Sequence, residues 1–259
     1  MPRYFADQTS PELGRLATSN ALVLLPVGTV EEHGPHLPVG TDALIVERVA
    51  AAAADALEGE IPTLVMPPIW TGYSAKGMTR WPGTIRLRTR TVADIVVQVC
   101  ASLVDMGFRK ILIVHGHGHH TGLLEMAVRE VADATGTYVA CVNPAAMAAE
   151  LFQQIRRSAP GGAIHGGEYE TSLMLHFGAP VQMDEATDVD TVQYHSAFIA
   201  GDNFAGKSKA FWSTWALHQS QTGLLGDPTV ATAETGRRLM EAIVTNLAQF
   251  AREFHAHPR

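Results

Sequence analysis

The sequence predicts an α/β fold in which a mostly parallel sheet is covered by helices on both faces. Two observations support this prediction. Short apolar segments alternate along the chain with longer segments whose apolar residues recur at helical spacing. The short segments are apolar at nearly every position, as expected for strands buried on both faces. We find no internal repeat and no linker, so we expect a single domain over residues 1–259.

The first half of the chain begins with a predicted helix over residues 10–17. Ser10 suits the N-cap, Pro11 the first helical position and Glu12 the first turn. A later helix ends at Gly107, a residue typical of C-terminal caps. The other elements expected in this half are a strand at 21–27, an alanine-rich helix at 43–58, a strand at 63–66, a Pro- and Gly-rich loop at 67–84 and the helix at 91–106.

In the second half, the β-branched segment 110–114 predicts another buried strand. Helices are expected at 121–135, 145–157, 168–177 and 232–254, and a strand at 138–142. Residues 190–225 are expected to be mostly irregular. This loop is rich in aromatic residues, which suit either association between subunits or a cover over the active site of its own or of a neighbouring subunit. They are Phe198, Phe204, Phe211, Trp212 and Trp215.

Composition excludes several classes of protein. The chain has a net charge of −7 and no basic stripe, which argues against a nucleic-acid partner. No apolar stretch has the length of a membrane span, and the N-terminus carries no signal region, so we expect no membrane partner. Cys100 and Cys141 have the setting of core thiols, which fits a cytoplasmic location.

The most informative segment is 31–42, which directly follows the first buried strand. It holds Glu31, His33 and Asp42, and carboxylate with imidazole is the ligand set of Zn²⁺, Mn²⁺ or Fe²⁺ in hydrolases. We interpret the segment as a metal site. The alternative is a polar loop in which Thr41 or Asp42 caps the next helix.

Two further clusters fall where the fold places its site. His115 to His120 follow the strand at 110–114, and ligands bind at the carboxyl ends of parallel strands. These imidazoles can act as ligands, proton shuttles or substrate contacts, unless the loop binds metal only adventitiously. His165 lies close to Glu168 and Glu170, an arrangement typical of an oriented proton shuttle; helix capping is the alternative for the two carboxylates.

Together these clusters resemble the creatininase family of metal-dependent amidohydrolases. The resemblance covers nearly the whole chain. It rests on PVGTVEEHGPHLPVGTD at 26–42, the GHG turn after the strand at 110–114, WPGTIRL at 81–87, HGGEYETS at 165–172 and GDPTVATAETG at 226–236. It implies a three-layer α/β/α sandwich, in agreement with the pattern, and a homo-oligomer such as a hexamer.

The resemblance also implies two divalent ions per subunit, Zn²⁺, Mn²⁺ or Fe²⁺. Asp42 would bridge them, Glu31 and His117 would complete one ion, and His33 would bind the other. We expect Glu168 to supply the last ligand, with His119 as the alternative. Catalytic roles are expected for His165 and Glu168, and substrate contacts for His119, His120 and Trp81.

The implied reaction is attack of a metal-activated water on a carbonyl of a small-molecule substrate, cleaving the C–N bond of a small cyclic or linear amide. Creatinine itself is not expected, because the residues that shape its pocket in creatininase are replaced by Gly118, Gly161 and Ile164. The alternatives are C–C cleavage of a cyclic ketone, a peptidase-like maturation reaction, and a non-catalytic metal-binding protein. Lys76, Arg80, Arg86 and His120 suit an anionic or polyhydroxylated substrate, or are ordinary surface residues.

Overall fold

The computed structural model describes residues 3–192, 196–206, 208–211 and 220–258 and confirms the predicted α/β class. Its central sheet is parallel throughout, with strand order β1-β3-β2-β4-β5. The strands are β1 (Arg3–Tyr4), β2 (Leu22–Val27), β3 (Thr63–Val65), β4 (Lys110–His115) and β5 (Ala140–Val142). The central strands β2 and β4 pair in register from Leu22–Lys110 to Val27–His115, so they end at the same level.

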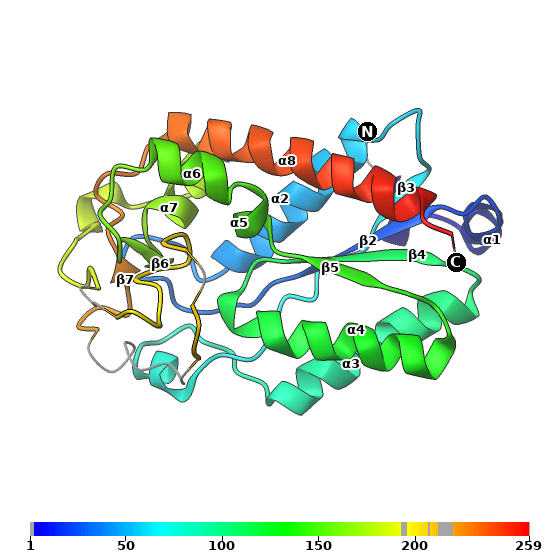
Figure 1. The fold of residues 1–259 in the computed structure, drawn as a ribbon, viewed down its shortest axis with the longest axis horizontal. Coiled ribbons are helices and arrows are strands. Elements are labelled where there is room, and N and C mark those ends of the chain that lie inside the picture. The colour runs from blue at the N-terminus through cyan, green and yellow to red at the C-terminus, as the bar shows by residue number, and fades with distance from the viewer. Residues whose placement is uncertain (1–2, 193–195, 207, 212–219, 259) are drawn as a thin grey trace.

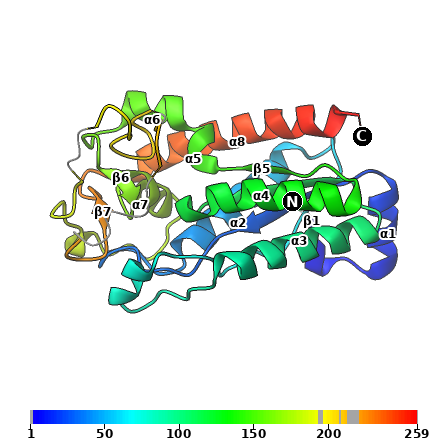
Figure 2. The same cartoon turned by 60° about the horizontal axis from the view of Figure 1, so that its bottom comes forward.

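Helices cover both faces of this sheet, which makes the predicted three layers (Figures 1 and 2). Alternate residues of β2 show the arrangement, because Leu22 and Leu24 pack into one core whereas Val23 and Leu25 pack into the other. The first core is closed by α2 (Thr41–Ala56), α5 (Pro144–Met147), α6 (Ala149–Ile155), α7 (Glu168–His176) and α8 (Ala233–Ala256). The second is closed by α1 (Ser10–Thr18), α3 (Thr89–Asp105) and α4 (Thr121–Thr135).

A small antiparallel pair lies at one end of the molecule, beside the carboxyl ends of the central strands (Figure 1). It joins β6 (Ala163–His165) to β7 (Leu225–Gly226), and the sequence did not predict it. The pair holds His165 next to the chain that returns from the long loop. Short 3₁₀ helices complete the described elements: η1 (Phe5–Asp7), η2 (Lys76–Arg80), η3 (Gly118–His120) and η4 (Met183–Glu185).

Two local predictions need correction. The N-cap of α1 is Thr9 rather than Ser10, because the Thr9 hydroxyl and backbone N–H both reach the Glu12 carboxylate in a capping box. The helix expected over 145–157 is divided at Ala148 into α5 and α6. In contrast, Gly107 ends the last turn of α3 with a φ of 100°, as expected for a glycine cap.

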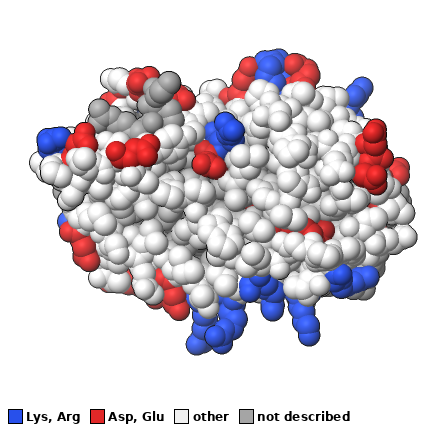
Figure 3. Space-filling model, turned by 180° about the vertical axis from the view of Figure 1, so that it is seen from behind, with Lys and Arg blue, Asp and Glu red and all other residues white. Residues whose placement is uncertain are grey.

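The surface carries its charges in scattered groups. None of the helices in the described ranges combines the length and the hydropathy needed to cross a bilayer. On the face shown in Figure 3, Lys and Arg gather along the lower margin, the side on which Figure 1 places α3. The exposed cations of this part of the chain are Lys76, Arg80, Arg86, Arg88 and Arg90.

The long loop after α7 is described only in part. Trp212 and Trp215 lie outside the described residues. Phe204 is buried, with its ring centroid 4.5 Å from that of Phe152 and 5.0 Å from that of Tyr169, which anchors the loop over α6 and α7. Asp202 adds an ion pair with Arg156 at 2.6 Å.

Candidate metal centre

The carboxyl ends of β2 and β4 bring the first two sequence clusters together. Glu31 and His33 follow β2, His117 follows β4, and Asp42 lies in the first turn of α2. The strand and the helix meet closely at Gly28, where a Cβ would lie 2.6 Å from the backbone of Ala43. The segment thus folds as predicted, and its carboxylates are buried instead of solvated.

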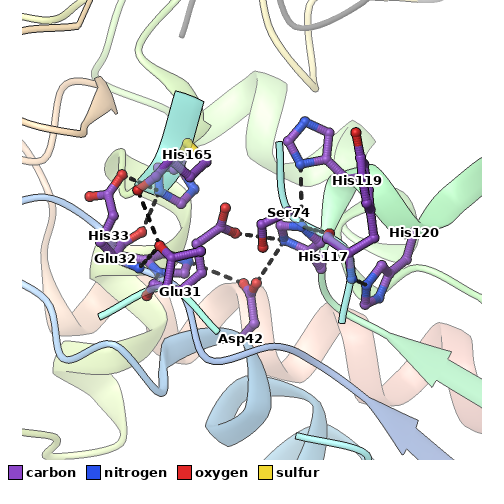
Figure 4. A network of polar contacts seen from close by, with 12 residues as sticks. Glu31, Glu32, His33, Asp42, Ser74, His117, His119, His120 and His165 are labelled. Carbon is purple, nitrogen blue, oxygen red and sulfur yellow. Dashed lines mark hydrogen bonds and ion pairs between the residues drawn. The ribbon is translucent and has the colours of Figure 1, made fainter. Parts of the chain in front are cut away.

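Asp42 lies between two imidazoles (Figure 4). Its Oδ1 is 3.2 Å from Nε2 of His33, and its Oδ2 is 2.9 Å from Nδ1 of His117. The same nitrogen of His117 is 3.2 Å from Oε2 of Glu31. One carboxylate therefore faces two separate donor groups, which is the geometry expected for a ligand that bridges two ions.

Two groups of potential ligands flank Asp42. Glu31, His117 and His119 form the first, and His33, His165 and Glu170 form the second. Within each group the ligand atoms all lie within 4.8 Å of one another. The predicted residues Glu31, His33, Asp42, His117, His119 and His165 are thus all brought together.

Backbone carbonyls fix the tautomers of three of these imidazoles. His33 donates from Nδ1 to the carbonyl of Glu31 at 2.9 Å, and His117 donates from Nε2 to that of Tyr73 at 3.0 Å. His165 donates from Nε2 to the carbonyl of Glu32 at 2.7 Å. The neutral rings of His33 and His117 then turn their other nitrogen towards Asp42 as a lone pair, the arrangement by which outer partners orient metal-binding histidines.

The electrostatics of the centre favour bound positive charge. Burial disfavours an imidazolium at His33, but Asp42, Glu170 and Glu31 together raise its pKa to about 10. Burial is likewise outweighed at His117, where Glu31 and Asp42 raise the pKa to about 9. Burial raises the pKa of Glu170 to about 7. These carboxylates are therefore stable as anions only beside a cation, either a protonated imidazole or a metal ion.

The donor set fits divalent metal ions. Both carboxylate oxygens of Glu31 are fully buried without a well-formed hydrogen bond among the described residues. An uncompensated buried carboxylate is costly, and coordination removes that cost. The cluster combines imidazole nitrogen with carboxylate oxygen, which suits Zn²⁺, Mn²⁺ or Fe²⁺.

Glu168 does not lie where the sequence analysis placed it. Its carboxylate turns away from His33 and accepts hydrogen bonds from the backbone N–H groups of Arg157 and Ser158, at 2.8–3.0 Å. Glu170 takes the position beside His33 instead. Residues two apart on a helix point about 200° apart, so only one of the two can face the centre.

The alternative to Glu168 needs the same correction. His119 was considered as the last ligand of the ion at His33, but it lies beside Glu31 and His117, in the other group. Its Nδ1 is 3.3 Å from Nε2 of His117. Glu170, which the sequence placed near His165 but for which no ligand role was predicted, is the carboxylate that stands beside His33. The only sign of this in the sequence was that Glu170 is an acidic residue five positions after His165.

Two predicted substrate contacts are not brought to the site. His120 is fully buried behind His117, and its Nε2 accepts the backbone N–H of Tyr73 at 3.1 Å. Gly72 allows this approach, because a Cβ there would lie 2.2 Å from the His120 ring. Trp81 packs against Arg80 on the surface. Neither His120 nor Trp81 is among the described residues that line the adjoining cavity.

That cavity has a volume of about 960 Å³ and opens directly onto the centre. Figure 4 shows His165 and His119 on opposite sides of the Glu31 carboxylate, and these three residues line the cavity together with His117 and Glu170. From there it extends past the end of β5 and under residues 199–204 and 208–211 of the long loop. The loop therefore covers the centre of its own chain. None of the exposed cations of residues 76–90 lines the cavity, which leaves them as surface residues.

Comparisons with known proteins agree with this picture. The family model Creatininase (creatinine amidohydrolase) matches residues 6–251. A mycofactocin precursor peptide peptidase of Mycobacterium tuberculosis is 31% identical over 240 residues, covering 89% of this chain and 84% of the relative. A 3-dehydro-scyllo-inosose hydrolase of Thermotoga maritima is 27% identical, covering 96% and 83%. A creatinine amidohydrolase of Pseudomonas putida is 26% identical, covering 92% of each chain.

Solved structures show the same fold. A creatininase described as the Mn form superposes with a TM-score of 0.81 at 23% identity, over 99% of this chain and 100% of the other. A variant described as a Zn-Zn type has the same score, identity and coverage.

Proposed function

The chain belongs to the creatininase family, and we propose that it is a metal-dependent hydrolase that cleaves the C–N bond of a small cyclic or linear amide. The observation that carries the proposal is the placement of Asp42 between two ligand groups whose histidines are oriented by backbone carbonyls. The carbonyls hold one nitrogen of each ring while the other nitrogen faces the buried Asp42 carboxylate, which is how outer partners orient metal-binding histidines.

The ligand roles follow from the two groups. Glu31 and His117 would hold one ion, His33 and Glu170 the other, and Asp42 would bridge them. Two ions bound in this way lower the pKa of a coordinated water and polarise a substrate carbonyl. We keep Zn²⁺, Mn²⁺ and Fe²⁺ as equal candidates, since selection among them depends on availability.

His165 is the proposed proton carrier. Its Nε2–H is held by the carbonyl of Glu32, which leaves the lone pair of Nδ1 to accept a proton. Burial and the neighbouring His33 hold its pKa well below the usual value, which keeps the ring neutral and ready to accept a proton. His165 can then deliver the proton to the leaving nitrogen without a covalent intermediate.

His119 lines the cavity, and we keep it as a substrate contact. Its pKa is lowered to about 4 by burial and by His117, so it is neutral near pH 7 and can donate or accept a hydrogen bond. We also propose a cytoplasmic homo-oligomer, such as a hexamer, that acts on a small molecule and has no nucleic-acid or membrane partner.

The test uses protein depleted of metal and then reloaded with Zn²⁺, Mn²⁺ or Fe²⁺. Release of amine is measured on a panel of cyclic amides, linear amides and formamides, and ring-opened acid on a panel of cyclic ketones. Amine release that requires metal and is lost in His165→Asn, but not in the control His176→Asn on the exposed side of α7, supports the proposal.

Ring opening of ketones without amine release would instead support C–C cleavage, the reaction class suggested by the inosose hydrolase relative. A protein that binds two ions and turns over neither panel would contradict the proposal and favour the non-catalytic alternative.

A further inference from the structure

The two proposed ligands of one ion come from distant parts of the chain and meet at a single glycine. His33 follows β2, whereas Glu170 lies on α7, and Gly166 lies between them. The N–H of Gly166 donates to Oε2 of Glu170 at 2.6 Å, and a Cβ on Gly166 would lie 2.8 Å from the carbonyl oxygen of His33. The turn at Gly166 therefore decides where Glu170 and the adjacent His165 stand relative to His33.

Gly166 needs outside contacts to hold its conformation. Its φ of 64° lies in the left-handed region, and glycine has more conformational freedom than any other residue. Its N–H is held by Glu170, but its carbonyl belongs to the other flanking peptide group. That carbonyl accepts the hydroxyl of Thr171 at 3.1 Å. Thr171 therefore fixes the half of the turn that Glu170 does not reach.

The hydroxyl of Thr171 does not take the partner that is usual in a helix. A helical threonine commonly donates to the carbonyl three or four residues earlier. The carbonyl four residues earlier is that of Gly167, which already accepts the backbone N–H of Thr171 at 3.0 Å. The hydroxyl instead reaches past the start of α7 to Gly166.

A second contact orients this hydroxyl. Nε2 of His36 lies 2.9 Å from Oγ1 of Thr171, and both side chains are buried. A hydroxyl has one proton, so both of its contacts are hydrogen bonds only if His36 donates from Nε2 and Thr171 donates to Gly166. Nδ1 of His36 is buried without a partner among the described residues, as suits a nitrogen that carries no proton. A hydrogen-bond relay thus runs from His36 through Thr171 to Gly166.

The alternative is that these two side chains serve the fold alone, because any buried polar group needs a hydrogen-bond partner. Their placement favours a narrower role. His36 belongs to the same loop as His33, and Thr171 directly follows Glu170. The relay therefore connects the two segments that supply ligands to one ion.

We propose that His36 and Thr171 are positioning residues of the metal centre, which set the places of Glu170 and His165 through the turn at Gly166. The inference rests on the proposed two-ion centre and concerns one half of it. The other ion takes its own ligands from outside these two segments, so the relay acts on the affinity of one ion and not on that of the other.

Thr171→Val and Thr171→Ser form the informative pair, since valine removes the hydroxyl and serine keeps it. Metal-depleted protein is titrated with Zn²⁺ against a chromophoric chelator, which measures the affinity of each ion. Thr171→Val should lower the affinity of one ion about 10–100-fold, as the loss of an outer partner of a metal ligand does, and leave the other ion unaltered. Thr171→Ser should bind both ions as the wild type does.

A double variant identifies the ion that is affected. If Thr171 acts through Glu170, the double variant Glu170→Gln/Thr171→Val should bind Zn²⁺ no more weakly than Glu170→Gln alone, because both changes weaken the same ion. The matched control is Thr63→Val, which removes a hydroxyl that donates to the carbonyl of Ile61 at the amino end of β3. Any loss of stability in this control should leave Zn²⁺ affinity unchanged.

A second pair of variants tests the relay from its other end, and it decides the matter even where Thr171→Val does not fold. His36→Leu removes the donor, whereas His36→Gln places an amide N–H near the position of Nε2. His36→Leu should weaken the same ion as Thr171→Val, and His36→Gln should retain most of the affinity that the leucine variant loses.

The outcomes separate this inference from the proposed function. Wild-type affinity for both ions in Thr171→Val and His36→Leu, with one ion lost in Glu170→Gln, would overturn the relay and leave the metal centre intact. Equal weakening of both ions, or additive losses in the double variant, would assign these residues to the fold alone and overturn the inference. A wild type that does not bind two ions would overturn the metal centre itself.

Discussion

Glu168 and Glu170 form a natural matched pair, because they lie two residues apart on α7 and differ in what their carboxylates touch. The perturbation is the same for both: Glu168→Gln and Glu170→Gln each remove one negative charge and keep the side-chain shape. We expect Glu168→Gln to destabilise the fold and leave metal binding intact. We expect Glu170→Gln to weaken metal binding and leave the metal-free fold intact.

The magnitude for Glu168 follows from its hydrogen bonds. The carboxylate is fully buried and accepts the N–H of Arg157 at 2.9 Å and that of Ser158 at 2.8 Å. Hydrogen bonds to a charged group contribute about 1.5–3 kcal/mol each, and glutamine would turn an N–H₂ group towards one of the two donors. The free energy of unfolding should therefore fall by about 2–4 kcal/mol in Glu168→Gln.

Glu170 should behave differently. Burial raises the pKa of its carboxyl to about 7, so that a neutral amide costs the metal-free fold little. Glu170 is, however, a proposed direct ligand beside His33 and His165. Its replacement should therefore lower the affinity for one of the two ions at least about a hundredfold, more than changes to outer-shell residues cost.

The assay is urea denaturation with excess chelator for both variants, followed by titration of Zn²⁺ against a chromophoric chelator. Glu168→Gln with reduced metal affinity and unchanged stability would refute the assignment of these two carboxylates. So would Glu170→Gln with two ions bound at wild-type affinity.

Three further predictions concern the surroundings of the centre. His120→Ala should lower Zn²⁺ affinity about 10–100-fold, because it frees the Tyr73 segment whose carbonyl orients His117. His120→Asn should keep part of the affinity that the alanine variant loses. Equal Zn²⁺ affinities of the wild type and His120→Ala in chelator competition would contradict this prediction. In metal-free protein, the pKa values of His33 and His117 are raised to about 10 and 9, so the folded state binds these protons more tightly than the unfolded one. The stability that these protons contribute is complete below about pH 6.5 and is lost as pH rises through 9–10. Urea denaturation with chelator should therefore show the free energy of unfolding declining from pH 7.5 to 9, by up to about 1.4 kcal/mol per pH unit for each imidazole. A flat or rising curve would be inconsistent with this prediction. Asp202→Asn should destabilise the fold by about 1–3 kcal/mol, since it removes the charge of a buried carboxylate that pairs with the half-buried Arg156. A thermal midpoint equal to wild type would show that the loop does not depend on this pair.

Much of the fold could be predicted because its elements have strong local patterns. The apolar, β-branched segment at 111–114 is typical of a buried strand, and the helix at 121–135 begins and ends as expected. The pair of β6 and β7 could not be predicted, because three and two residues are too few for an alternating pattern to register. Its partners are also about 60 residues apart, so their pairing depends on the tertiary fold.

The candidate site, like the fold, could be predicted only in part. Glu31, His33, Asp42 and His117 were identifiable because they follow strands whose carboxyl ends converge at one edge of the sheet. The choice between Glu168 and Glu170 depended on which face of α7 turns inwards. That rotation is set by the contacts of α7 with α8 and α2, which no local pattern records. His120 was misjudged for a related reason, since its neighbour Gly72 is distant in sequence.

The bridged two-ion centre is tested most directly by the metal content per chain. Elemental analysis would compare the wild type, Asp42→Ala and the control Asp94→Ala, which changes an exposed carboxylate on α3. The account predicts about two ions per chain in the wild type and the control, and a loss of most of this metal in Asp42→Ala. One ion or none in the wild type, or equal metal in all three proteins, would contradict it.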